Sequence, residues 1–103
     1  MNDQDYIRKA VELADGTWFV QDSGEIQTPY MQVLPIDELM QWDLDALAAQ
    51  LVRQVDATEQ YYVVVRDDQT EIRSCGAINK LEQGGDRTMN TIKAVIDSGV
   101  LKD

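Results

Sequence analysis

The chain has 103 residues, of which 19 are acidic and 9 are basic, so its formal net charge is −10. A chain of this length is typical of one domain and can bury a modest hydrophobic core without cross-links. It has no histidine and one cysteine, Cys75. This composition excludes an intrachain disulfide, a Ser-His or Cys-His catalytic pair and a zinc site built from these two residue types.

The sequence favours a location in the cytoplasm. No apolar run approaches the roughly 20 residues that span a bilayer. The first residues also lack the basic-then-apolar order of a secretory signal. A single cysteine is consistent with a reducing compartment.

The acidic residues are concentrated in one half of the chain. Residues 1–52 hold ten carboxylates and two basic side chains, whereas residues 53–103 hold nine and seven. Acidity of this kind is common in soluble proteins, but a concentrated acidic surface also suits a partner with a basic surface. Direct binding to nucleic acid is disfavoured, because phosphate contacts need clustered Lys and Arg.

The first third of the chain predicts a helix followed by a hairpin. Apolar residues recur at helical spacing over residues 3–14, and Asn2 or Asp3 is suited to cap that helix. Residues 17–21 and 26–33 are rich in strand-forming side chains. Pro29 limits the second strand to an edge or an irregular segment.

Leu34–Ala57 is the longest helical pattern. Its apolar stripe comprises Leu44, Leu47, Ala48, Leu51 and Val55, extended backwards by Ile36 and Met40. Asp43 could cap a separate helix beginning at Leu44, so one helix and two helices are both open. Glu38, Asp43 and Asp45 fall largely off the stripe, which gives the segment an acidic side.

The last 43 residues predict a second hairpin and a third helix. Tyr61–Arg66 is the strongest strand signal and can pair with Thr70–Ser74. Its continuous apolar run, Tyr61–Val65, is typical of a central strand covered on both faces. Residues 77–85 favour a polar connection. A helix is expected over Arg87–Ser98, capped by Asp86 or Thr88 and followed by a glycine C-cap.

This order predicts an α+β fold with a single domain over residues 1–103. We expect two layers, in which three helices pack on a small, mainly antiparallel sheet in the order α-ββ-α-ββ-α. The residues expected to share one core are Tyr62, Val64, Leu47, Leu51, Ile92 and Ile96.

Three segments resemble known sequences: DYIRKAVELADG, LDALAAQLVRQVDAT and DRTMNTIKAVIDSGVL. They are similar to small uncharacterised proteins encoded by phages and prophages of proteobacteria. The resemblance implies a short accessory protein that works in the cytoplasm of a bacterial host cell. Small acidic phage proteins include inhibitors of host defence such as anti-CRISPR proteins, some of which mimic DNA.

The sequence offers little chemistry for catalysis or metal binding. Two compact carboxylate pairs are the candidates for a cation site. Asp43 and Asp45 are better explained as ordinary helix residues, because side chains at i and i+2 on a helix point apart. Asp67 and Asp68 are better explained as ordinary turn residues. Cys75 favours a structural role, and residues 84–88 favour a flexible connection over an anion site. We therefore predict no enzyme activity, no metal and no cofactor.

The most suggestive feature is a set of acidic and aromatic residues around the central segment. Its members are Glu38, Trp42, Asp43, Asp45, Asp37, Asp22 and Glu25. We expect this set to bind a basic surface on a host protein, the alternative being a solvated helix face. Trp42 is expected to be partly exposed, whereas most of Trp18, Phe19 and Tyr30 are expected in the core. The alternative function is self-association, with an apolar helix face completing a homodimer.

Overall fold

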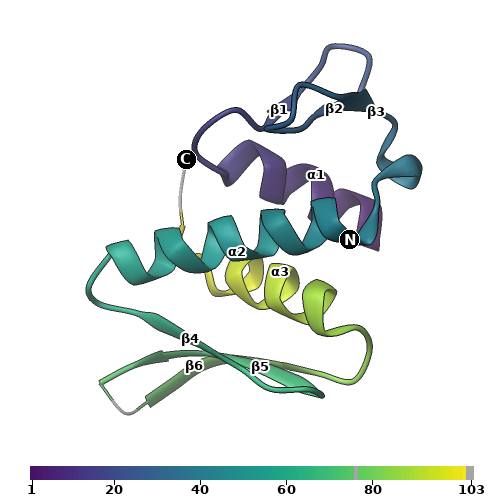
Figure 1. Ribbon diagram of the computed structural model, residues 1–103. Helices are drawn as coiled ribbons and strands as arrows, with labels where there is room; N and C mark the ends of the chain where they lie inside the picture. The colour runs from purple at the N-terminus through teal and green to yellow at the C-terminus, as the bar shows by residue number, and fades with distance from the viewer. Residues whose placement is uncertain (76, 102–103) are drawn as a thin grey trace.

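The computed structural model describes residues 1–75 and 77–101, and three α-helices form its central layer (Figure 1). Helix α1 spans Asp3–Leu13. It begins in a capping box, in which Asn2 Oδ1 accepts the Asp5 N–H at 2.8 Å and the Asp5 carboxylate accepts the Asn2 N–H at 3.4 Å. The cap fixes the start of the helix close to where the sequence predicts it.

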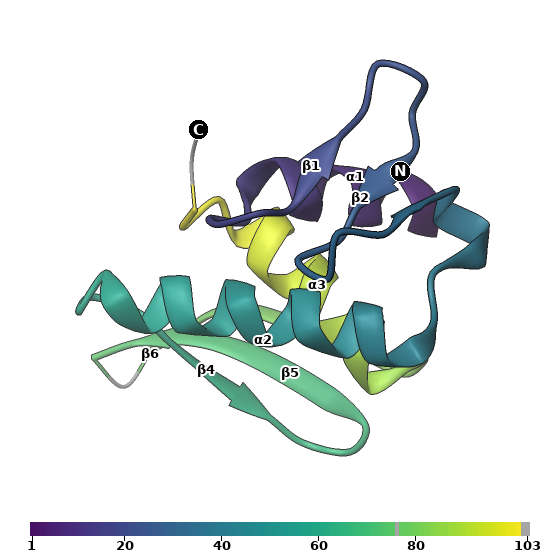
Figure 2. The same ribbon diagram turned by 45° about the horizontal axis from the view of Figure 1, so that its top comes forward.

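A small antiparallel sheet, here called sheet A, lies beside α1 (Figures 1 and 2). Its strands, in spatial order, are β1 (Phe19–Val20), β2 (Ile26–Gln27) and β3 (Val33–Leu34). The strand predicted over residues 26–33 is in fact two strands. Pro29 lies in the turn between them, where the Thr28 N–H donates to Gln32 O at 2.8 Å.

The predicted helix over Leu34–Ala57 is interrupted. A 3₁₀ turn, η1, covers Ile36–Glu38, and α2 covers Gln41–Ala57. Leu39 and Met40 between them have extended backbone angles. The second helix therefore begins three residues before Leu44.

A second antiparallel sheet, sheet B, lies on the other side of the helical layer (Figure 1). Its strands are β4 (Tyr62–Val65), β5 (Gln69–Ser74) and β6 (Ala77–Gln83), with β5 in the centre. Two predictions were wrong here. The apolar segment that forms β4 is an edge strand, and the expected polar connection forms strand β6, whose polar side chains suit an exposed edge.

Helix α3 (Arg87–Ser98) lies where it was predicted. Asp86 caps it by accepting the Met89 N–H at 3.0 Å, and Gly99 ends it with φ +70°. Asn90 Nδ2 donates to Gly84 O at 2.6 Å. The expected flexible connection is thus a hydrogen-bonded turn.

The core lies between the helices and the inward faces of both sheets. Leu47, Leu51 and Ile92 are fully buried, and Ile96 packs against them, as predicted. The assignment of Tyr62 and Val64 to the core was wrong. The side chains that pack toward the helices are those of Val63 in β4 and of Tyr61, which directly precedes the strand. Because side chains alternate along a strand, an error of one residue reverses the whole face.

The α+β fold class and the antiparallel pairing are confirmed. The strands divide into two sheets, which Figure 2 shows on different sides of the helices. Within residues 1–75 and 77–101, no helix is both long and apolar enough to cross a bilayer.

Candidate functional site

The turn between β2 and β3 holds two large side chains in solvent. The Met31 N–H donates to Thr28 O at 3.0 Å, which closes a turn with Pro29 and Tyr30 at its tip. Tyr30 is 68% exposed and Met31 is 74% exposed. Met31 has φ +66°, a left-handed conformation that costs a residue other than glycine roughly 1–2 kcal/mol. Local strain of this kind often accompanies a functional surface.

Trp42 meets this turn from another element. It is the second residue of α2 and is 66% exposed. Tyr30, Gln32 and Trp42 together line a hollow of about 380 Å³, which we call the Tyr30–Trp42 hollow. Met40, which directly precedes α2, is also 53% exposed. Two aromatic rings from separate elements thus share one concave surface.

A second concavity, of about 260 Å³, continues this surface along α2. Tyr30 lines both concavities, so the two adjoin at this residue. Ala46, Gln50 and Arg53 provide the α2 side of the second one. The outward face of α2 and the tip of sheet A therefore form one extended, irregular surface.

The predicted acidic set does not form a single patch. Asp22 and Glu38 are exposed. Asp37 and Glu25 line a hollow of about 310 Å³ that also contains Arg8, so a guanidinium group accompanies these carboxylates. These four residues lie in the turn of sheet A and in or beside η1.

Asp43 is not a surface residue. It is fully buried, and its Oδ2 atom accepts the Met40 N–H at 3.0 Å at the start of α2. The prediction of Asp43 on the acidic face was wrong. The periodicity placed it off the stripe, but α2 begins at Gln41, which makes Asp43 the third helical residue, able to reach back to the preceding backbone.

Asp45 faces α3 instead of forming a patch with Glu38. Its Oδ1 atom accepts hydrogen bonds from Thr88 Oγ1 at 2.5 Å and Gln41 Nε2 at 2.9 Å. These hydrogen bonds, chiefly the one from Thr88, hold the pKa of Asp45 below its ordinary value. Asp43 and Asp45 therefore diverge, as helical spacing requires.

Asp45 also borders a groove of about 400 Å³ between α2, β4 and α3. The groove has an apolar floor that includes Ala49, Val52 and Val65. Arg53 and Arg87 line it, but Arg53 donates to Gln50 at 2.8 Å and Arg87 lies 3.6 Å from an Asp67 oxygen. Both guanidinium groups thus already have partners within the protein.

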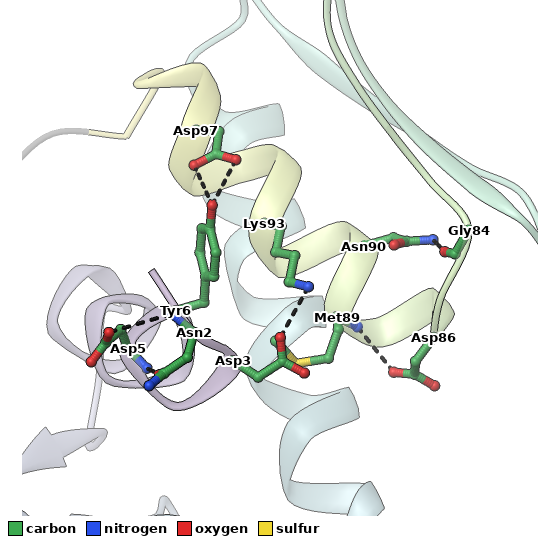
Figure 3. Close-up of polar contacts among 10 residues, drawn as sticks. All are labelled: Asn2, Asp3, Asp5, Tyr6, Gly84, Asp86, Met89, Asn90, Lys93 and Asp97. Carbon is green, nitrogen blue, oxygen red and sulfur yellow. Dashed lines mark hydrogen bonds and ion pairs between the residues drawn. The ribbon is translucent and has the colours of Figure 1, made fainter.

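A polar cluster joins α1 to α3 (Figure 3). The Tyr6 hydroxyl donates to both oxygens of Asp97 at 2.9 Å, and Lys93 pairs with Asp3 at 3.0 Å. The hydrogen bond to Asp97, followed by burial, raises the pKa of Tyr6. Burial, and then the neighbouring Asp97, raise the pKa of Glu82 on β6. The hydrogen bonds hold two helices together.

Other residues weighed from the sequence lie apart from this surface. Within the described residues, no three Cys, Asp or Glu side chains converge to hold a metal ion. Asp67 and Asp68 belong to the turn between β4 and β5. Cys75 is exposed directly after β5, with φ +43°, so its thiol is not packed in the core.

The aromatic residues were only partly predicted. Trp42 is exposed, as expected, and Trp18 is buried. The expectation that most of the others lie in the core was wrong, because Phe19 and Tyr30 are 56% and 68% exposed. The exposure of Tyr30 could have been predicted from its place directly after Pro29. Proline favours the second position of a turn, and the next residue then lies at the tip of that turn.

No protein-family model, curated protein or solved structure matches this chain. The resemblance to small phage and prophage proteins therefore stays a prediction. The Tyr30–Trp42 hollow stands on geometry and physical chemistry alone.

Proposed function

We propose that this chain is a protein-binding module that docks through the Tyr30–Trp42 hollow onto a partner with a basic surface. The observation that carries the proposal is the pairing of two largely exposed rings, from the tip of sheet A and the start of α2, around one concavity. Tyrosine and tryptophan are enriched at binding hot spots because they bury much area at little entropic cost.

The surroundings of the hollow support a protein partner. Met31 and Met40 add flexible apolar side chains, which adapt to the contours of a partner. Met31 has an unfavourable left-handed backbone, and the apolar side chains of Tyr30 and Met31 remain in solvent although burying them would be favourable.

The charge of the chain supports a basic partner. The 3₁₀ turn η1, which directly precedes α2 in the chain, carries the exposed carboxylates of Asp37 and Glu38. Asp22 lies farther away, because the β1–β2 turn and the turn that holds Tyr30 are at opposite ends of β2. Exposed carboxylates beside an aromatic anchor increase the rate of association with a basic surface and fix its orientation. Arg8 lines the same hollow as Asp37 and reduces this effect there, so Glu38 is the better candidate for steering.

The experiment combines capture with mutation. The full chain, immobilised, is used to capture proteins from bacterial lysate, and captured partners are identified by mass spectrometry and titrated individually. Trp42→Ala and Tyr30→Ala should each weaken the affinity of a genuine partner at least about thirtyfold, as loss of a hot-spot residue does. Glu38→Gln should mainly slow association, and this effect should shrink as salt rises from about 0.05 to 0.5 M.

Phe19→Ala is the matched control, because Phe19 is an exposed aromatic residue of sheet A outside the hollow. Its affinity should equal that of the unmodified chain. A partner whose affinity is unchanged by Trp42→Ala and Tyr30→Ala, in variants with unchanged thermal unfolding, would refute docking at this hollow.

A narrower proposal concerns the biological role. We infer from the phage-like resemblance, the size and the acidity that the module acts in the cytoplasm of a bacterial host, where it inhibits a defence protein by occupying its basic nucleic-acid groove. Competition tests it directly: the captured partner should lose nucleic-acid binding as this chain is added, and the Trp42→Ala variant should fail to compete.

A further inference from the structure

The outward face of sheet B is a second, separate surface. The two helices that contact this sheet, α2 and α3, lie on one side of it (Figures 1 and 2). On the centre strand, Ile72 and Thr70 point to the helices, since Ile72 is in the core and Thr70 shares a 3.1 Å hydrogen bond with Thr91 of α3. The alternation of a strand therefore places Glu71 and Arg73 on the opposite face.

The strand register defines what surrounds these two charges. Glu71 is paired with Val64 on β4 and Leu81 on β6, and Arg73 is paired with Tyr62 and Ile78. Directly paired residues project from the same face. Three of these four apolar neighbours are markedly exposed, with Tyr62 at 42%, Ile78 at 51% and Leu81 at 39%. The face is thus a charged centre between two apolar margins.

The charged centre is poorly satisfied within the chain. Glu71 is only 5% exposed, yet its buried Oε2 atom accepts no hydrogen bond from the described residues. That oxygen lies 3.5 Å from Nε of Arg66, whose own side chain is 60% exposed. Nε of Arg73 is likewise buried without a hydrogen-bond partner in the described part of the chain. Buried polar atoms of this kind ordinarily have partners.

We propose that the outward face of sheet B binds the same face of a second copy of this chain, forming a symmetric dimer. The argument is charge self-complementarity. A two-fold axis perpendicular to β5 at the level of Ile72 makes the two centre strands antiparallel across the interface. Glu71 of each copy then faces Arg73 of the other, which adds a second cation beside the Glu71 carboxylate to the Arg66 that already pairs with it and gives Arg73 an anionic partner.

The distribution of charge supports a second copy as the occupant. Glu71, Arg66 and Arg73 give this face a net charge of +1, whereas the whole chain carries −10. Sheet A and η1, which carry Asp22, Glu25, Asp37 and Glu38, lie across the helical layer from sheet B (Figure 1). The two acidic halves would therefore lie far apart in the dimer, where salt screens their repulsion.

The size of the face sets the expected affinity. Strands lie about 4.8 Å apart and rise about 3.4 Å per residue, so three strands of this length cover roughly 300 Å². This is well below the roughly 800 Å² that each partner buries in a standard interface. The dimer should therefore be weak and reversible, with a dissociation constant in the micromolar range.

Sedimentation equilibrium of the full chain, from about 5 μM to 1 mM in about 0.15 M salt, tests the dimer. We expect the mass to rise from monomer to dimer with concentration. Ile78→Ser, on the proposed interface, should weaken the dimer severalfold. Val33→Ser, the matched exposed position on sheet A, should not. A monomer throughout, or equal effects of the two variants, would overturn the proposal.

A charge exchange tests the pairing of Glu71 with Arg73. Glu71→Arg alone and Arg73→Glu alone should each weaken self-association at least about tenfold, because like charges then face each other. An equimolar mixture of the two variants should associate again, since every contact is then between opposite charges. Arg53→Glu on α2 has the same net charge as Arg73→Glu and should leave dimerisation unchanged.

The dimer experiments and the partner-binding experiments at the Tyr30–Trp42 hollow can be distinguished by their results. Failure of the mixture to associate, with both variants folded by circular dichroism, would rule out this pairing. If either charge variant unfolds, the exposed Ile78→Ser substitution still decides whether the face is an interface. Trp42→Ala should leave the dimer unchanged, so this proposal and the proposed function can fail independently.

Discussion

Sheets A and B present side chains to solvent in different ways. In sheet A each strand has two residues, and the exposed Tyr30 and Met31 belong to a turn with a left-handed residue at its end. In sheet B the strands have four to seven residues, and exposed residues such as Tyr62 follow regular alternation. An irregular turn can direct an aromatic ring into a hollow beside a helix, whereas a regular strand produces a flat face. The hollow beside the turn of sheet A suits a partner that projects into it, whereas the flat face of sheet B suits the same face of a second copy of this chain.

The largest expected change in stability comes from truncating one buried isoleucine in each sheet, which allows the two sheets to be compared. Ile72 on β5 and Ile26 on β2 are both fully buried. Ile72→Ala should lower the free energy of unfolding by about 3–5 kcal/mol, because β5 is held between two strands and α3 and cannot collapse onto the cavity. Ile26→Ala should cost about 2–3 kcal/mol, because two-residue strands relax more easily. Urea unfolding measures both, and a larger loss at Ile26 would contradict the comparison.

A smaller effect should come from the left-handed residues at the turns. Met31, in the turn between β2 and β3, has φ +66°, and Cys75, directly after β5, has φ +43°. Replacing either residue with glycine should stabilise the fold by up to about 1 kcal/mol, because glycine adopts this conformation without strain. The gain is reduced by the conformational entropy that glycine adds to the unfolded chain. Only Met31→Gly should also weaken partner binding. Loss of stability in Met31→Gly would show that the side chain is packed rather than strained.

The smallest expected effect depends on pH and concerns the inward edge of sheet B. The pKa of Glu82 is raised from its ordinary value of 4.5 by burial and by Asp97, so the folded state holds its proton more tightly than the unfolded state. The resulting penalty is absent at pH values below 4.5 and is fully present above the raised pKa. Glu82→Gln should therefore raise the melting temperature slightly at pH 7, with no gain at pH 3.5. An equal gain at both values would mean that ionisation of Glu82 is not involved.

The elements of this chain were largely predictable because caps and apolar spacing are local signals. Helix α3 lies between Asp86 and Gly99 as expected, and α1 begins beside Asn2 as expected. The strands were harder, because β6 is an edge strand whose polar residues resemble a loop. The inward face of β4 was assigned to the wrong residues because all of its central positions are apolar, so the sequence contains no alternation from which to choose a face.

The candidate surface was predictable in part. Trp42 was expected in solvent and is there, but the sequence offered no reason to pair it with Tyr30, twelve residues earlier on another element. The acidic set was misjudged at Asp43 because its role depends on where α2 begins. A helix that starts at Gln41 turns this carboxylate into an internal cap.

The sequence by itself determined the α+β class, the helix boundaries within a few residues and a strongly acidic charge, because these follow from spacing, capping and composition. The tertiary structure alone decided that the strands form two sheets on opposite sides of the helices. It also decided which strand is central, and that Glu71 and Arg73 share a face which no described helix covers. The physical reason is that strand pairing and burial depend on contacts between residues distant in the chain, and local propensity does not encode these contacts.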